Sequence, residues 1–291
     1  MRLKADFEAD WVGHLRSELV LAQGWSASEV AALDDRDIRY RYLDGQRRRM
    51  AIRPRAILIA REFLCPTQHE PGWRTLQAKA LKGEDLNPHL SKRHASLFNS
   101  DGLLAEWGVH HFHLGRLADA SNPAYVERTG PLLYALVNDQ TVYAVNMYCH
   151  QDFEDTSVLE IIHNNWPDLI SRYRVRGVTA GNWSAAEKRA LRKKNGNVFA
   201  GVADGTVYMP ISGGVMASGV SAEAVRLADF WHDRIHALQT SFELKLAELL
   251  PTLTKHGYSG EDEVEAQLKF VVNGPQVFFP KFGILATLTV E

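Results

Sequence analysis

Apolar residues recur with two different periods along the chain, and the change of period separates expected helices from expected strands. The first 33 residues show helical spacing, with Ser26 or Ser28 available to cap a second short helix. Residues 38–43 alternate apolar and basic side chains and precede Asp44-Gly45, a turn sequence. This pattern predicts a basic β-hairpin whose second strand continues through residues 50–59.

The centre of the chain predicts three strands followed by a helix. Residues 109–114, 132–137 and 141–148 are short segments rich in residues that suit a pleated surface. After Asp155 the apolar residues return to helical spacing as far as Leu169. We therefore expect a β-β-β-α unit.

The C-terminal third mixes further hairpins with one long helix. Ala203-Asp204-Gly205 separates two short strands, a helix is expected from Ser221 to about residue 250, and strands follow it. Strands come in adjacent pairs and do not alternate with helices, so the predicted class is α+β. Antiparallel β-hairpins, segregated helices and a central three-stranded sheet with one helix are its expected parts.

The length of 291 residues exceeds the usual size of one domain, which favours a division into parts. The pattern predicts a helical and basic hairpin region over residues 1–100 and the histidine-rich β-β-β-α unit over 101–170. Residues 171–291 are then expected to form an α+β region with the long helix. The added regions suggest recognition or inhibition, and a regulatory protein is one expected partner.

The composition of the chain indicates the class of protein and the compartment in which we expect it. The chain is 45% hydrophobic and 23% charged, as in ordinary globular proteins, and its two cysteines form no CxxC motif. The first residues lack an apolar signal core, and no run approaches the roughly 20 apolar residues that cross a bilayer. We expect a cytoplasmic protein that does not contact a membrane.

Charge is segregated along the chain although the net charge is only -2. Residues 101–170 contain 2 Lys or Arg and 10 Asp or Glu, whereas residues 171–200 contain 8 and 1. Such blocks create local fields in a nearly neutral protein. By sequence, the histidine-rich region is the most acidic part of the chain.

The candidate chemistry centres on three histidines within four residues, His110, His111 and His113. Side chains alternate faces along a strand, so His111 and His113 share one face, about 7 Å apart, and His110 lies on the other. The same alternation pairs His150 with Asp152. These four residues predict either a divalent-metal site or a metal-free general acid/base site. The alternative is that one or two of the histidines are hydrogen-bonded core or interface residues.

Three segments in order, His111-Phe112-His113-Leu114, then 131–137, then 142–153, resemble the central hairpins of RelE-like toxins. The resemblance covers about 50 residues within the stretch from about 107 to 170. It implies an endoribonuclease that works on such a sheet with Arg, Lys, His or Tyr side chains and without a metal. RNA or another nucleic acid is the implied partner.

Metal-free RNA cleavage needs a group that takes the proton of the 2′-hydroxyl, a group that protonates the leaving oxygen, and a cation. His111, His113 and His150, with Asp152, are the candidates for the proton transfers, and Arg116 or Arg128 is the local cation. The basic hairpin is expected to add phosphate contacts. Its arginines are Arg39, Arg41, Arg47, Arg48, Arg49, Arg53 and Arg55.

Two other functions remain open from the sequence. His111, His113, His150 and Asp152 would form the metal site of a divalent-metal-dependent phosphoesterase. A non-enzymatic module would instead bind nucleic acid or an acidic protein through the arginine-rich hairpin, unless that hairpin is simply a solvated sheet edge. Elsewhere, His232 and His236 have the i, i+4 spacing of a metal-binding helix but lack the glutamate of an HExxH motif.

Overall fold

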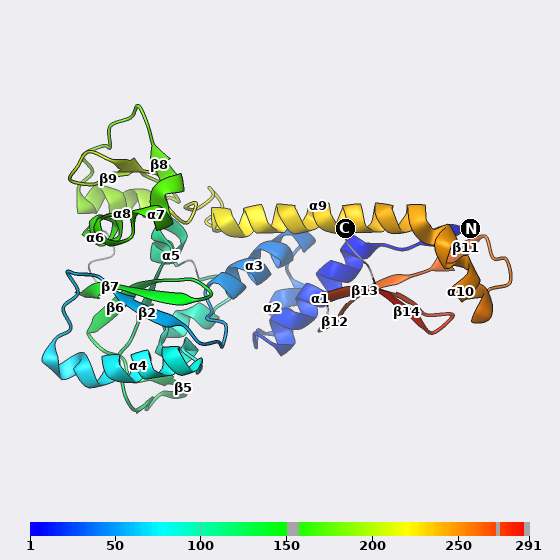
Figure 1. The fold of residues 1–291 in the computed structure, drawn as a ribbon, viewed down its shortest axis with the longest axis horizontal. Coiled ribbons are helices and arrows are strands. Elements are labelled where there is room, and N and C mark those ends of the chain that lie inside the picture. The colour runs from blue at the N-terminus through cyan, green and yellow to red at the C-terminus, as the bar shows by residue number, and fades with distance from the viewer. Residues whose placement is uncertain (100, 150–156, 272–273, 288–291) are drawn as a thin grey trace. The chain divides into compact units, whose positions relative to one another are not determined.

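The computed structural model describes residues 1–99, 101–149, 157–271 and 274–287 (Figure 1). The chain divides into two compact units, one formed by Met1–Leu43 with Val225–Glu291 and the other by Asp44–Ala224. Both contain helices and small sheets, so the α+β class is confirmed. The division of the sequence into three parts stays a prediction.

A four-stranded sheet organises the unit Asp44–Ala224. Its strands are β2 (Ala56–Ile59), β7 (Thr141–Cys149), β6 (Pro131–Val137) and β3 (Val109–Phe112), in that spatial order. The three expected strands are present, and β6 and β7 form the expected antiparallel hairpin. The sheet has one strand more than predicted, because β2 adds to β7 in parallel.

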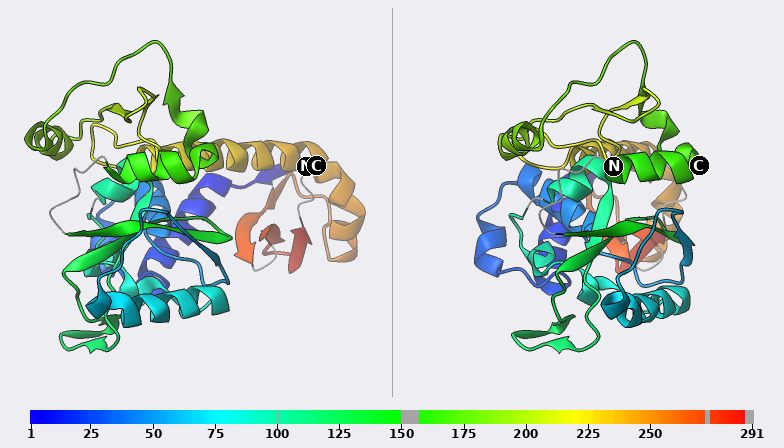
Figure 2. Two further views of the ribbon diagram at one scale, coloured as in Figure 1. Left: turned by 60° about the vertical axis from the view of Figure 1, so that its left-hand side comes forward. Right: turned by 90° about the vertical axis from the view of Figure 1, so that its left-hand side faces the viewer.

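Each face of this sheet is covered by helices. Helix α4 (Glu70–Lys82) packs on one face, where Trp73 and Leu76 share a core with Leu133 of β6. Helices α5 (Gly102–Trp107) and α6 (Ser157–Asn165) pack on the other face around Tyr134 (Figures 1 and 2). Neighbouring residues of a strand therefore enter different cores, as side-chain alternation requires.

The remaining elements of this unit are short. Strands β8, β10 and β9 form a second antiparallel sheet, and the predicted hairpin around Asp204 is its β9–β10 pair. Helix α8 is closed at its N-terminus by a capping box of Ser184 and Glu187. The bounds are η1 (Thr67–His69), η2 (Asn87–His89), η3 (Lys92–Ala95), β4 (Ala118–Asp119), β5 (Asn122–Val126), α7 (Pro167–Ile170), η4 (Ser171–Tyr173), β8 (Arg174–Val175), α8 (Ala185–Lys193), β9 (Ala200–Gly201) and β10 (Val207–Tyr208).

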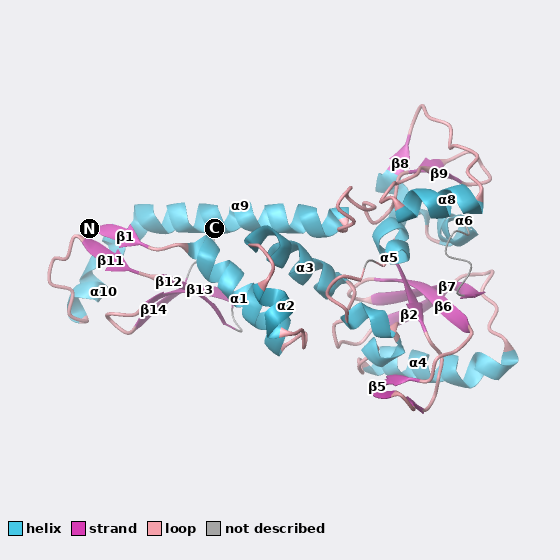
Figure 3. Ribbon diagram, turned by 180° about the vertical axis from the view of Figure 1, so that it is seen from behind, coloured by secondary structure: helices cyan, strands magenta, loops and turns pink. Residues whose placement is uncertain are grey.

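The other unit packs helices against a three-stranded antiparallel sheet. Strands β12 (Gln267–Val271), β13 (Gly274–Phe279) and β14 (Ile284–Thr287) form the sheet, and β1 (Arg2–Lys4) pairs with β11 (Glu263–Glu265) (Figure 3). Phe242 of helix α9 (Ala222–Lys245) packs at an angle between Phe7 and Phe279, with ring centroids 6.2 and 5.9 Å away. Phe7 belongs to helix α1 (Phe7–Leu21), so these aromatic contacts join α1, α9 and the sheet.

The predicted basic hairpin is wrong. Residues Asp35–Arg47 form helix α3, which follows the short helix α2 (Ala27–Ala31). The Asp34 carboxylate accepts from the Asp37 N–H and caps the helix, and Ile38 is fully buried. Gly45 lies inside the helix, not in a turn, and Asp44 pairs with Arg47 and Arg48 at helical spacing. Arg39, Arg41 and Arg47 are thus helical, and Arg48, Arg49 and Arg53 lie in the irregular segment that follows.

The long helix ends earlier than predicted. Helix α9 ends at Lys245, and a 3₁₀ turn, η5 (Leu246–Leu249), leads into helix α10 (Leu250–Lys255). Pro251 sits in the first turn of α10, where its missing N–H costs nothing. Within the described residues, the search for a helix long and apolar enough to span a bilayer finds none.

The surroundings of two glycines predict that an added methyl group changes the free energy of unfolding in opposite directions. A Cβ at Gly72 in α4 would lie 1.8 Å from the Leu114 carbonyl oxygen, whereas a Cβ at Gly13 in α1 meets no atom within 4 Å. Gly72→Ala should lower the free energy of unfolding by about 1–3 kcal/mol through overpacking. Gly13→Ala should raise it by about 0.5–1 kcal/mol because alanine favours the helix. Urea denaturation followed by circular dichroism measures both, and a change of the same sign in the two variants would contradict this packing.

Candidate functional site

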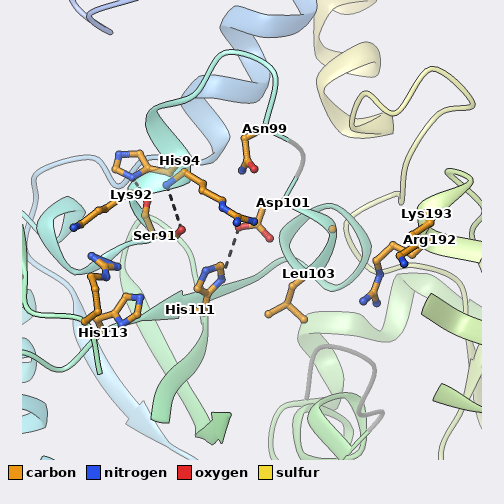
Figure 4. A pocket seen from close by; sticks show the side chains of 13 residues that line it. Ser91, Lys92, His94, Asn99, Asp101, Leu103, His111, His113, Arg192 and Lys193 are labelled. Atoms are coloured by element: carbon orange, nitrogen blue, oxygen red, sulfur yellow. Dashed lines mark hydrogen bonds and ion pairs between the residues drawn. The ribbon is translucent and has the colours of Figure 1, made fainter. Parts of the chain in front are cut away.

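A polar pocket of about 760 Å³ in the unit Asp44–Ala224 brings together three histidines, His94, His111 and His113 (Figure 4). His111 comes from β3, His113 directly follows that strand, and His94 belongs to η3. The segment between η2 and η3 therefore faces the end of β3. The three histidines thus come from segments about 20 residues apart in the sequence, and Arg192 and Lys193 join them from much farther along the chain.

Alternation along β3 separates the histidines as predicted. His111 and His113 line this pocket, whereas His110 lines a second pocket of about 450 Å³ beside Arg49 and Asn138. Antiparallel pairing with β6, which sets His111 opposite Tyr134, fixes this register. The pairing thus decides which imidazole enters which pocket.

His113 is held in place through its own backbone. Its N–H donates to the His89 carbonyl oxygen at 2.7 Å, and His89 Nδ1 donates to the His113 carbonyl oxygen at 2.8 Å. His89 is fully buried, and burial lowers its pKa to about 4, against the smaller effect of its bond to His113. A neutral His89 with Nδ1 protonated suits this bond, and Lys79 Nζ lies 3.3 Å from its Nε2.

The His113 ring has a defined tautomer. The Thr129 N–H donates to His113 Nδ1 at 3.0 Å, so Nδ1 carries the lone pair. The ring is 3% exposed. Neutral His113 therefore has its proton on Nε2, where it acts as a hydrogen-bond donor.

The His94 ring has the opposite tautomer. His94 Nδ1 lies 2.7 Å from the Ser91 carbonyl oxygen, to which it must donate, so the lone pair is on Nε2. Burial lowers the pKa of His94, and the charges of Arg49, Arg48 and Arg128 lower it further, against the bond to Ser91. His94 is therefore a neutral acceptor at Nε2 near neutral pH.

His111 lies beside a carboxylate. Its Nδ1 is 3.8 Å from Asp101 Oδ2 (Figure 4). The other carboxylate oxygen accepts from the Leu104 N–H at 3.1 Å, which caps α5 and orients Asp101. Asp101 thus places a carboxylate beside the His111 ring.

The pocket is cationic although its strand lies in the most acidic part of the sequence. Five of its lining residues are Lys or Arg and one is Asp. They are Lys92, Arg93, Arg128, Arg192, Lys193 and Asp101. Arg128 Nη2 donates to the Leu90 carbonyl oxygen at 2.7 Å, while its buried Nη1 has no hydrogen-bond partner among the described residues. Lys92 and Arg192 pair with Asp119 and Glu106.

The predicted site is therefore only partly assembled. His111 and His113 meet, but Arg116 is exposed and does not line the pocket, whereas Arg128 does. His150 and Asp152 lie outside the described residues. Sequence reasoning assigned no role in the site to Lys92, His94, Asp101, Arg192 or Lys193, and the basic stretch Lys92-Arg93-His94 was the signal that it passed over.

The arginines of the expected hairpin mostly have partners inside their own unit. Arg47 pairs with Asp44 and donates to the Ser212 and Ser221 hydroxyls. Arg48, with 1% of its side chain exposed, pairs with Asp44 and donates to the carbonyl oxygens of His94 and Ser96. Arg53 pairs with Asp139, and Arg39 with Glu8. Arg47 and Arg48 therefore support the structure and do not form an exposed phosphate-binding edge.

The predicted metal set includes His150 and Asp152, so the described residues do not test it. Among these residues, the group with metal-ligand spacing consists of Glu8, His232 and His236, in the other unit.

Comparisons with models of protein families, with curated proteins and with solved structures found no significant match.

Two buried histidines predict a loss of stability in acid. Burial lowers the pKa of His89 to about 4 and that of His110 to about 3, whereas both titrate near 6.5 in the unfolded chain. Below pH 6.5 the unfolded state binds more protons, so the free energy of unfolding falls as the pH falls toward 4. Each histidine should cost about 2 kcal/mol between pH 7 and pH 5.

Urea denaturation at several pH values measures this loss. His89→Asn, which keeps a donor for the His113 carbonyl oxygen, should show a shallower pH dependence, and His69→Ala should match the wild type. An unchanged slope in His89→Asn would contradict the buried, neutral state of His89.

Proposed function

We propose that this chain is an endoribonuclease, as the resemblance to RelE-like toxins implies, and that it cleaves phosphodiester bonds in the pocket of His94, His111 and His113. The observation that supports this most is the pair of opposite tautomers in one cationic pocket, an acceptor at His94 Nε2 and a donor at His113 Nε2. Phosphodiester transfer needs an acceptor for one proton and donors for a developing negative charge.

His94 is the proposed general base. Its Nε2 takes the proton of the ribose 2′-hydroxyl while the 2′-oxygen attacks phosphorus. Because its pKa is lowered, the His94 ring stays neutral at pH values at which an ordinary histidine is already protonated. The hydrogen bond of Nδ1 to Ser91 stabilises the imidazolium that forms.

His111 is the proposed general acid. Its imidazolium, facing Asp101, gives a proton to the 5′-oxygen as the bond between phosphorus and that oxygen breaks. The products are a 2′,3′-cyclic phosphate and a 5′-hydroxyl. His94 ends protonated and His111 neutral, and exchange with water resets both.

His113 and Arg128 are proposed to bind the phosphate. Neutral His113 would become an imidazolate if it lost its Nε2 proton, so its role is donation of a hydrogen bond and not proton transfer. The Arg128 guanidinium, which lines the pocket, is a second donor, and Lys92 adds charge. This assignment moves His113 away from the general acid/base role expected from the sequence.

The substrate and setting follow from this role. RNA is the proposed partner, and a reducing cytoplasm is the proposed location because Cys65 and Cys149 are free thiols. A regulatory protein that restrains the nuclease is a further proposed partner.

The decisive experiment incubates purified protein with an end-labelled RNA oligonucleotide in excess chelator. His94→Ala and His111→Ala should each lower the rate about 10²–10⁴-fold, while His69→Ala, outside the pocket, should match the wild type. A 2′-deoxy substitution at the cleaved position should block cleavage, and the product should carry a cyclic phosphate.

Three results would reject the proposal. Equal rates in the histidine variants would remove the acid/base roles. Activity lost in chelator would favour a metal-dependent phosphoesterase. Salt-sensitive RNA binding without cleavage would favour a non-enzymatic module.

A matched pair of arginines tests phosphate binding. Arg128→Ala should lower kcat about 10²–10³-fold because it removes charge and donors from the pocket, whereas Arg116→Ala should stay within about twofold. Single-turnover cleavage of the same RNA gives both values. An equal loss in the two variants would show that general surface charge, and not the pocket, determines the rate.

A further inference from the structure

A second group of ionisable side chains lies in the other unit and takes no part in the proposed cleavage. Glu8 is in the first turn of α1, and His232 and His236 are one turn apart on α9. Glu8 Oε1 lies 3.0 Å from His232 Nδ1, and Glu8 Oε2 lies 3.1 Å from His236 Nε2. The two imidazole centroids are 4.7 Å apart. One carboxylate thus faces both rings.

The structure already places a positive group between two of these acceptors. Arg39 Nη1 donates to Glu8 Oε1 and lies 2.9 Å from His232 Nδ1. A guanidinium has no acceptor, so the His232 nitrogen must offer its lone pair to Arg39. His232 Nδ1 and Glu8 Oε1, 3.0 Å apart, therefore both accept from Arg39 Nη1, and its positive charge relieves the repulsion between these two acceptors.

We propose that Glu8, His232 and His236 bind a transition-metal ion of the zinc class, for which the Arg39 guanidinium is the internal competitor. Two ligands of a tetrahedral ion with bonds of 2.0–2.1 Å lie about 3.3 Å apart. The 3.0 Å between Glu8 Oε1 and His232 Nδ1 comes close to this distance, and His236 Nε2 lies 3.1 Å from the other carboxylate oxygen, Oε2. One ligand atom from each residue lies within 4.8 Å of the others.

The donor set defines the class of ion. Two imidazoles and one carboxylate suit Zn²⁺, Co²⁺, Ni²⁺ or Cu²⁺, whereas Mg²⁺ and Ca²⁺ prefer sets of oxygen ligands. Three protein ligands leave a coordination position open, and 60% of the His236 side chain is exposed, so the ion has an entry path. The bound ion would join α1 to α9 and stabilise this unit.

The test uses tag-free full-length protein titrated with Zn²⁺ by isothermal calorimetry, with thermal unfolding as a second readout. The wild type should bind one ion at this site and unfold at a higher temperature with zinc. Glu8→Gln and His236→Ala should each weaken binding more than about tenfold. Arg39→Met should tighten it at least about tenfold because the competing charge is gone.

Two controls assign the ion to this site. His256→Ala changes an exposed histidine in the same unit and should bind as the wild type does. The double variant His111→Ala/His113→Ala, with far-UV circular dichroism to confirm folding, should also keep the ion. Failure of the wild type to bind, binding that survives His236→Ala, or loss of the ion in the double variant would each overturn the proposal. None of these outcomes depends on ribonuclease activity.

Discussion

The candidate site depends on two reciprocal hydrogen bonds between His89 and His113. One runs from the His113 N–H to the His89 carbonyl oxygen, and the other from the His89 ring to the His113 carbonyl oxygen. Together they hold the segment after α4 against the end of β3. That segment carries Lys92 and His94, so the same two bonds bring the proposed base and a cation to the strand histidines. Protonation of the buried His89 ring would oppose this arrangement, which is why its lowered pKa matters for the site as well as for stability.

The charge of the pocket is a property of the fold, not of the strand that lines it. Acidic residues near β3 are used as partners for the cations: Glu106 pairs with Arg192, Asp119 with Lys92, and Asp101 faces His111. The excess positive charge comes from η3, from Arg128 and from the end of α8. An anionic substrate would therefore meet a positive field inside an acidic sequence region.

The sequence predicted those elements whose signal is local. The β6–β7 hairpin, the hairpin around Asp204 and the separation of His110 from His111 follow from side-chain alternation and turn chemistry. The strand predicted over residues 38–43 is wrong because alternating Arg and Tyr residues are also typical of a strand. The helical signal is the pair of Asp44 with Arg48, one helical turn later. The rest of the site could not be predicted from the order of residue types along the chain. The tautomers of His94 and His113 depend on a main-chain carbonyl of Ser91 and a main-chain N–H of Thr129, which nearly every residue type supplies.

The tautomers themselves are the most direct test of this account. Nitrogen-15 NMR of the histidine rings at neutral pH, with His94→Ala and His113→Ala spectra for assignment, reports which ring nitrogen carries the proton. We expect His94 to carry its proton on Nδ1 and His113 on Nε2. The same tautomer in both rings, or rapid exchange between tautomers in either, would contradict the pairing of an acceptor with a donor on which the proposed function rests.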